Sequence, residues 1–388
     1  MARVALISLL ISALVCLASA AFNITSKNNV AVYYGQGPNQ KRLTTYCADP
    51  NIDIIILSFV NLFPEQANGY PGINFGNQCS AETYPGPGFK GVKVPSKDRL
   101  YKCYNLQQDL YTCRQTSDKK ILISLGGETP DYNVNGATNG TSFANQLWGM
   151  FGPRVDTWTS LGKPRPFDYV NTTSNDPTIH AFSADGFDLD IEHASLDKAA
   201  GYKALVRRLR TLYATATDKP YYLTASPQCT AGDPNLSDVL QTVKFDMLFL
   251  QFYNTPKCSA RGWIAANPNY VPGGTFNQTT GVNWSFTFDS WVNWLSTNAT
   301  VSKGAPIFLT LPGANAAAST GAYITVAQTK NIASAYYCRA SFAGIGVWEA
   351  TYAETSIVNG KNFYQNAKAT LVAASTDKRL SCVKTKKI

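Results

Sequence analysis

The sequence predicts an α/β fold, a single (β/α)8 barrel of the TIM type with long loops on the C-terminal face of its strands. Two patterns in the 388 residues support this prediction. Short apolar runs alternate with helical or loop-rich stretches, as in parallel β/α units, and eight such runs follow in series. An open doubly wound sheet is the alternative, but no glycine-rich phosphate-binding fingerprint follows the first run. The expected strands are residues 30–35, 52–60, 120–125, 186–192, 221–225, 247–252, 307–311 and 344–348.

Apolar residues at helical spacing, such as Leu205, Leu209 and Leu212, predict helices between the strands. Two long stretches rich in turn residues, 64–98 and 129–181, follow the second and third strands. We expect both at the C-terminal face, where loops build the active sites of barrels and could wall a cleft. The ranges expected to be helical are 195–215, 288–296 and 363–374.

The first twenty residues are typical of an export leader. Arg3 precedes an apolar run over 4–18, and Ala18, Ser19 and Ala20 fit a signal-peptidase site. We therefore expect a signal peptide over 1–20 and a folded unit over 21–388. The run is short for a transmembrane helix, and the basic C-terminus lacks the tail of a lipid anchor. We therefore expect an extracellular protein, and association with the cell wall is compatible with this expectation.

Cysteine content and charge agree with export. Of 9 cysteines, Cys16 leaves with the leader, so 9 − 1 = 8 remain, an even number that indicates disulfides. Asn-X-Ser/Thr sequons such as Asn139, Asn235 and Asn283 permit glycosylation. Although the net charge is +9, Lys and Arg are scattered without a basic stripe, which argues against a nucleic-acid partner. We expect a monomer without a membrane anchor.

The run 185–192, with the sequence DGFDLDIE, carries the chemistry. Side chains alternate along a strand, so Asp188, Asp190 and Glu192 share one face and the apolar residues between them share the other. The acidic face would point into the barrel, where carboxylates are costly to bury and branched apolar residues are usual. This arrangement therefore indicates an active site. Asp185 has the opposite parity, and we expect it to pin the start of the strand by hydrogen bonds.

Glu192 lies nearest the C-terminal end of this strand and so nearest a substrate. Like charge on Asp190 is expected to raise the pKa of Glu192, as a general acid near neutral pH requires. The two carboxyls lie on one wall and cannot flank a sugar ring from opposite faces. No second carboxylate is evident as a nucleophile, so the substrate would have to supply one.

The spacing Asp-x-x-Asp-x-Asp-x-Glu in this run resembles the signature of family 18 glycoside hydrolases, the chitinases. The segments 124–127 (SLGG) and 251–254 (QFYN) are similar to the family's third-strand and sixth-strand motifs, and Trp348 stands at its eighth-strand tryptophan. The segment 33–36 (YYGQ) and the Glu192-His193 pair resemble the plant and fungal class III branch. The resemblance extends over about residues 30–352.

This resemblance implies retaining, substrate-assisted hydrolysis of β-1,4-linked N-acetylglucosamine. Glu192 would act as general acid and base, and Asp190 would hold the substrate's acetamido group. Asp188 would share a proton or hydrogen bond with Asp190, and Tyr253 would donate a hydrogen bond to the acetamido oxygen. The implied substrate-binding residues are Trp348, Gln251, Asn254, Tyr33, Phe59 and Gly127, and the implied structural residues are Ser124 and Gly126.

The resemblance also implies the pairing of the cysteines. The class III branch has a bridge between the positions that follow the fifth and sixth strands. The implied pairs are Cys229 with Cys258, Cys47 with Cys113 and Cys79 with Cys103, which leaves Cys338 and Cys382 as a fourth pair.

Three functions remain open at this point. The first is a secreted, endo-acting chitinase that binds chitin or chitooligosaccharides. The second is an inactive lectin or inhibitor on the same fold, and the third is an endo-N-acetylglucosaminidase or lysozyme-like relative. His180 and His193, the only histidines, match no standard metal spacing. We expect no metal and no cofactor, and the absence of a Gly-x-Ser-x-Gly elbow argues against a serine hydrolase.

Overall fold

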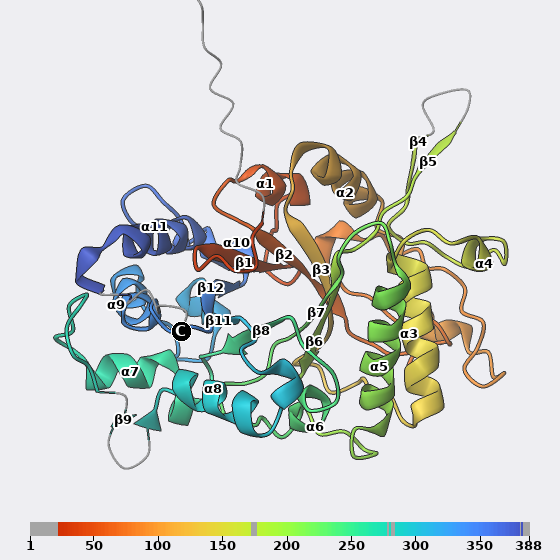
Figure 1. Cartoon of the computed structure of the whole chain (residues 1–388). Helices are drawn as coiled ribbons and strands as arrows, with labels where there is room; N and C mark the ends of the chain where they lie inside the picture. Colours follow the sequence, from red (N-terminus) through yellow and green to blue (C-terminus); the bar gives the residue numbers. More distant parts are fainter. Residues whose placement is uncertain (1–21, 172–176, 278, 281–283, 381, 383–388) are drawn as a thin grey trace, which may run out of the picture.

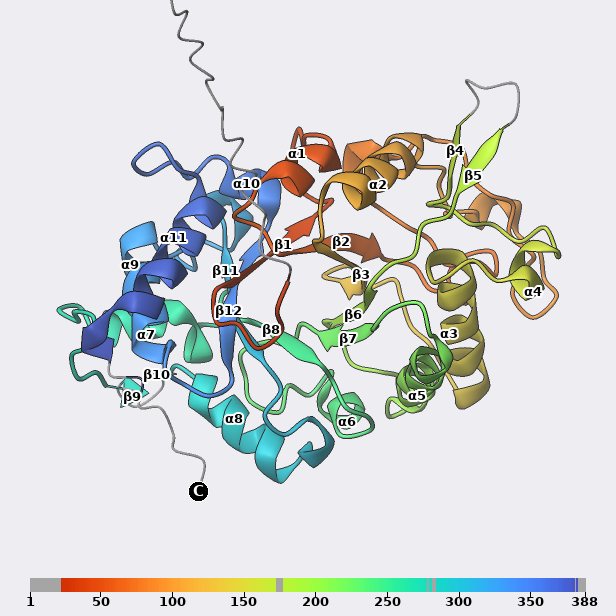
Figure 2. The same cartoon turned by 45° about the horizontal axis from the view of Figure 1, so that its top comes forward.

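A computed structural model describes residues 22–171, 177–277, 279–280, 284–380 and 382. Eight parallel strands close into a barrel in the order β1-β12-β11-β8-β7-β6-β3-β2, which confirms the (β/α)8 prediction (Figures 1 and 2). The expected leader and Asn283 lie outside the described residues. The barrel strands are β1 Asn29–Tyr34, β2 Ile54–Val60, β3 Lys120–Gly127, β6 Gly186–Ile191, β7 Tyr222–Ala225, β8 Met247–Gln251, β11 Ile307–Pro312 and β12 Phe342–Trp348.

Helices surround the strands on the outside, and Figure 2 shows this ring around the barrel. The three ranges expected to be helical are helical, although the first helix begins at Ala200. The helices are α1 Leu43–Ala48, α2 Tyr104–Thr116, α3 Ala137–Phe151, α4 Asp156–Thr159, α5 Ala200–Thr215, α6 Ser237–Leu240, α7 Ala260–Ala266, α8 Phe288–Thr297, α9 Val326–Tyr336, α10 Ala350–Ala353 and α11 Phe363–Thr376. Two short antiparallel pairs, β4 Tyr169–Asn171 with β5 Thr178–His180 and β9 Thr279–Thr280 with β10 Trp284–Ser285, interrupt the series.

Each barrel strand contributes to two separate cores because its side chains alternate between the barrel interior and the helices. In β2, Ile55 and Leu57 pack toward the helices, whereas Ile54 and Ile56 belong to the smaller cluster inside the barrel. Strands buried on both faces are continuous apolar runs, and this is why their positions could be predicted to within a few residues.

The acidic strand β6 has the predicted parity. Phe187 and Leu189 pack in the outer core, whereas Asp188 and Asp190 are buried on the inner face. Asp185 pins the start of the strand, as expected. Its carboxylate accepts hydrogen bonds from the backbone nitrogen of Ile121 at 2.7 Å, from Arg114 Nη2 at 2.8 Å and from Lys219 Nζ at 2.9 Å.

The first long insertion, 64–98, lies at the C-terminal face as expected, and its Asn74 pairs through the backbone with Phe59. The expectation was wrong for most of the second insertion, 129–181. The helix α3 within it is the crossover helix that runs back along the barrel, and the carbonyl of Phe151 accepts from the nitrogen of Ala184 just before β6. The segment between them, with α4 and the β4–β5 hairpin, packs on the outside of the barrel beside α2, where Tyr111 contacts Tyr169 and His180 and Gln107 donates to the carbonyl of Pro166.

All four expected disulfides are present. They tie loops at the strand ends and the helices around them, and closure of such loops is expected to stabilise the fold by a few kcal/mol each. The pairs are Cys47–Cys113, Cys79–Cys103, Cys229–Cys258 and Cys338–Cys382. Among the described residues, no helix has both the length and the apolar character needed to cross a bilayer.

Replacing Asp185 by Asn should lower the free energy of unfolding by about 3 kcal/mol, because it leaves two cations without their buried counter-charge. Denaturant unfolding measures this change. Asp238→Asn is the matched control, since that carboxylate is half exposed beside Lys203 and should contribute less than about 0.5 kcal/mol. Equal effects of the two substitutions would show that the Asp185 contacts do not hold the strand.

Candidate active site

The carboxyl ends of the barrel strands open into a cavity of about 470 Å³. Most of the residues predicted to form the site meet there, although they come from five different strands or the loops that follow them. The predicted residues that line the cavity are Phe59, Gly126, Gly127, Asp190, Glu192, Gln251, Tyr253, Asn254 and Trp348.

Gln251, the last residue of β8, links Asp190 of β6 with Glu192, which directly follows that strand. Its amide nitrogen donates to Asp190 Oδ1 at 2.8 Å and lies 3.4 Å from Glu192 Oε1. The same nitrogen also donates to the backbone carbonyl of Ser226 at 3.0 Å, which fixes the amide across the cavity floor.

Burial is the largest of the causes that raise the pKa of Glu192 to about 7, and the nearby carboxylates of Glu128 and Asp233 contribute to the same rise. The direction agrees with the sequence prediction, but the largest cause is burial and not the charge of Asp190. Contact with Asp190 lowers the pKa of Glu192, because a hydrogen bond from a neighbouring carboxyl stabilises the ionised form. Asp190 itself has a pKa raised well above its usual range, first by burial and then by the charges of Glu192 and Asp188.

Asp188 lies below the cavity floor and is fully buried. The expected hydrogen bond to Asp190 is absent among the described residues, because hydroxyl groups from neighbouring strands occupy both carboxylate oxygens of Asp188. Burial raises the pKa of Asp188, and these hydroxyls lower it. They belong to Thr224 at 2.6 Å, Ser124 at 2.8 Å, Ser226 at 2.8 Å and Tyr33 at 3.4 Å.

Tyr33 does not line the cavity, contrary to the prediction. Its side chain points into the barrel, where its ring lies edge-on to Phe249 and 5.6 Å from the ring of Trp348. Its hydroxyl contacts both Asp188 and the hydroxyl of Ser226. Tyr33 therefore supports the site from beneath.

Trp348 and Phe59 form an apolar wall, with their rings stacked 5.8 Å apart. The two glycines at the end of β3 allow this wall and the acidic strand to approach. A Cβ on Gly126 would lie 2.2 Å from the carbonyl oxygen of Asp190, and one on Gly127 would lie 3.0 Å from the ring of Phe59. Both glycines also have a positive φ, so larger residues would strain the backbone here.

Tyr253 and Asn254 follow β8 directly. Burial raises the pKa of Tyr253 well above its usual range, so its hydroxyl remains a hydrogen-bond donor. Asn254 adopts a left-handed backbone conformation with φ of 58°, and its side-chain oxygen accepts from the nitrogen of Ser319 at 2.9 Å. Asn254 thus fixes a neighbouring loop at the edge of the cavity.

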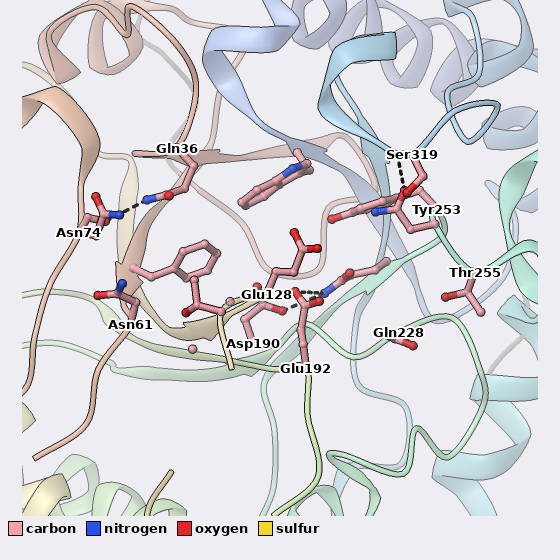
Figure 3. A pocket seen from close by; sticks show the side chains of 17 residues that line it. Gln36, Asn61, Asn74, Glu128, Asp190, Glu192, Gln228, Tyr253, Thr255 and Ser319 are labelled. Carbon is pink, nitrogen blue, oxygen red and sulfur yellow. Dashed lines mark hydrogen bonds between the residues drawn. The ribbon is translucent and has the colours of Figure 1, made fainter. Parts of the chain in front are cut away.

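Polar residues that sequence reasoning did not place in the site complete the cavity. Asn61 and Glu128 directly follow β2 and β3, and polar residues immediately after parallel strands could have indicated them. Asn74 comes from a long insertion whose path the sequence does not reveal. The additional lining residues, most of them labelled in Figure 3, are Gln36, Asn61, Asn74, Glu128, Thr129, Gln228, Thr255 and Ser319.

The two histidines lie outside the cavity. The His193 ring packs 4.3 Å from the ring of Tyr132, and His180 packs against Tyr111 near the β4–β5 hairpin. No group of three or more metal-ligating side chains occurs in the part of the chain that the structure describes.

Residues 29–378 match the protein family described as "Glycosyl hydrolases family 18". The chain belongs to this family. Endochitinase A of Emericella nidulans is 36% identical over 366 residues, which are 93% of this chain and 34% of that protein. Endochitinase A of Aspergillus niger is 37% identical over 357 residues, which are 91% of this chain and 25% of that protein. The family 18 chain thus spans 34% and 25% of the length of these two relatives.

Solved structures share the fold at lower sequence identity. A chitinase from Ipomoea carnea has a TM-score of 0.59 at 24% identity and covers 88% of this chain and 99% of its own. A xylanase and alpha-amylase inhibitor protein from Scadoxus multiflorus has a TM-score of 0.60 at 22% identity and covers 88% and 97%. Because an enzyme and an inhibitor share this fold, function has to be argued from the side chains of the site.

Glu128→Gln should lower the pKa of Glu192 in this family 18 chain, because it removes a negative charge that opposes ionisation of the acid. Carbon-13 NMR of the glutamate carboxyls measures the titration, and Glu192→Gln assigns the resonance. Glu82→Gln makes the same charge change outside the cavity and should have no effect. An unchanged or raised pKa of Glu192 in Glu128→Gln would contradict the prediction.

Proposed function

We propose that this family 18 chain is an endo-acting chitinase that hydrolyses β-1,4-linked N-acetylglucosamine with retention of the anomeric configuration. The observation that carries the proposal is Glu192, a carboxyl with a pKa of about 7 that opens into the cavity beside Asp190. Such a group is protonated below neutral pH and can donate its proton, whereas an ordinary glutamate cannot. The names of the fungal relatives, which are endochitinases, agree with this substrate.

In the first step, Glu192 transfers its proton to the glycosidic oxygen while the bond from that oxygen to the anomeric carbon breaks. The carbonyl oxygen of the substrate's own acetamido group attacks the anomeric carbon and forms an oxazolinium ion. Asp190 accepts a hydrogen bond from the acetamido nitrogen and holds the carbonyl in line. Tyr253 donates a hydrogen bond to the acetamido oxygen.

In the second step, Glu192 accepts a proton from water as the water oxygen attacks the anomeric carbon and opens the oxazolinium ring. Attack occurs from the face that the leaving group vacated, so two inversions give net retention. The acid is then protonated again and the acetamido group is restored. The stacked pair of Trp348 and Phe59 offers an apolar surface to the sugar ring at the cleavage point.

Glu128 is a third carboxyl in the cavity, so a mechanism with a protein nucleophile has to be considered. Its side chain is exposed, and none of the described residues forms a hydrogen bond or ion pair with it. A catalytic nucleophile is usually oriented by such contacts. We therefore assign the nucleophile to the substrate and not to Glu128.

We also propose that the chain is exported and acts on chitin outside the cell. The leader-like segment 1–20 supports export. The four disulfides are in keeping with an oxidising compartment.

Glu192→Gln should reduce hydrolysis of N-acetylglucosamine oligomers by several orders of magnitude while oligomer binding is retained, because the amide cannot donate the required proton. Product analysis by size and anomer, together with calorimetric binding, measures both effects. Glu128→Gln serves as the comparison and should retain hydrolysis with the β-anomer formed first. Equal loss in both variants would favour a mechanism with two protein carboxyls, and full activity of Glu192→Gln would remove this residue from the role of acid.

Tyr253→Phe should lower kcat by about tenfold to a hundredfold with little change in oligomer affinity. Its hydrogen bond should strengthen as charge develops on the acetamido group, so the loss falls mainly on the transition state. Steady-state kinetics and binding of oligomers to an inactive background separate the two effects. A change confined to binding would assign Tyr253 to substrate recognition alone.

A further inference from the structure

We propose that Tyr132 is a positioning residue for Glu192, because its hydroxyl ties the backbone of the acid to the glycine turn at the end of β3. This inference rests on the proposed function in one respect, namely that Glu192 is the general acid. Tyr132 does not line the cavity and would act only through the residues that it holds.

Glu192 lies just beyond the sheet that carries it. Pairing of β6 with β3 ends at Ile191 opposite Gly127, and pairing with β7 ends at Leu189 opposite Ala225. Neither neighbouring strand therefore supplies the next hydrogen bond for the backbone of Glu192. Without another partner, the peptide that carries the acid would leave the barrel unsupported on both sides.

The Tyr132 hydroxyl takes the place of this missing bond. It accepts from the backbone nitrogen of Glu192 at 3.0 Å and donates to the carbonyl oxygen of Gly127 at 2.9 Å. The carbonyl oxygen of Asp190 lies 3.2 Å from the same hydroxyl and offers a second acceptor. The hydroxyl of Tyr132 thus connects the end of β3 with the backbone of both Asp190 and Glu192 at the mouth of the barrel.

The ring of Tyr132 is itself held firmly. Only 1% of the residue is exposed, and its ring packs 4.9 Å from that of Phe63 and 4.3 Å from that of His193. His193 follows Glu192 in the chain, so the phenol contacts both sides of this peptide. Burial raises the pKa of Tyr132, which keeps the hydroxyl protonated and able to donate at every pH relevant to Glu192.

The support of the backbone matters because few hydrogen bonds hold the side chain of Glu192 in place. Its hydrogen bond to Gln251 is long, at 3.4 Å, and its other contact is with the carboxyl of Asp190, which is itself an acid on the same strand. The position of the carboxyl therefore depends on where the backbone places it. A displacement on the order of 1 Å in a catalytic group can reduce a rate about a hundredfold.

The first test compares Tyr132→Phe with Tyr202→Phe. Tyr202 is a matched control because it is buried, packs against the same Phe63 and has a hydroxyl without a partner among the described residues. We expect Tyr132→Phe to lower kcat on N-acetylglucosamine oligomers by roughly tenfold to a hundredfold, with KM changed less than about twofold. Tyr202→Phe should leave both unchanged, and circular dichroism should confirm that both variants are folded.

The second test does not require activity. Carbon-13 NMR should show a lower pKa for Glu192 in Tyr132→Phe than in wild type or Tyr202→Phe, because a carboxyl released from its buried position is better solvated. The groups that face this carboxyl are the same in all three proteins. They are Asp190 on β6, Glu128 after β3, Asp233 after β7, and Gln251 and Tyr253 at the end of β8.

The outcomes separate the two proposals. A wild type that fails to hydrolyse the oligomers would overturn the proposed chitinase, and the NMR titration alone would then decide the role of Tyr132. An active wild type with Tyr132→Phe equal to Tyr202→Phe in kcat and in the pKa of Glu192 would overturn the positioning role. A fall in kcat with an altered Glu192 titration in Tyr132→Phe alone would establish it.

Discussion

The placement of three carboxyl groups along the inner face of β6 and its immediate continuation, with Asp188 and Asp190 buried and Glu192 half-buried, is the constraint on which the rest of the site depends. Charged groups inside a barrel are unfavourable unless each one is hydrogen-bonded or neutralised. The three carboxyls lie at different depths in the barrel, and each one meets this requirement through different partners. Four hydroxyls surround Asp188 at the bottom, the amide of Gln251 binds Asp190 in the middle, and Glu192 at the top opens into the cavity.

Because their surroundings differ with depth, the three carboxyls at alternate positions along this strand differ in their chemistry. Asp188 accepts several hydroxyl hydrogen bonds that favour its ionised form, although burial opposes it. Burial and the charges of its two neighbours raise the pKa of Asp190 well above its usual range, and burial is the largest cause that raises the pKa of Glu192 to about 7. Residues two apart on a single strand can thus have different protonation behaviour without any change of residue type beyond Asp to Glu.

The parts of the molecule governed by local periodicity could be predicted from the sequence. The eight strands, the parity of β6 and the pinning role of Asp185 all follow from alternation along a strand. The disulfide pairs came from resemblance to a family and not from spacing. Predictions that required knowledge of distances between elements failed, as with Tyr33, which lies beneath the cavity, and with Asp188, whose partners are hydroxyls from other strands. Tyr132 escaped notice because only the fold places it beside Glu192, whereas the position of Glu128 directly after a strand could have indicated that residue.

The second insertion has a consequence for how the protein can vary. It leaves the barrel after Phe151 and returns at Ala184, and these two residues are joined by a backbone hydrogen bond. Because its ends are already adjacent, a change in its length adds only slowly to the entropy of loop closure. None of the described residues between Phe151 and Ala184 lines the cavity, so this segment can acquire new contacts, or accept an engineered graft, without altering the residues that do.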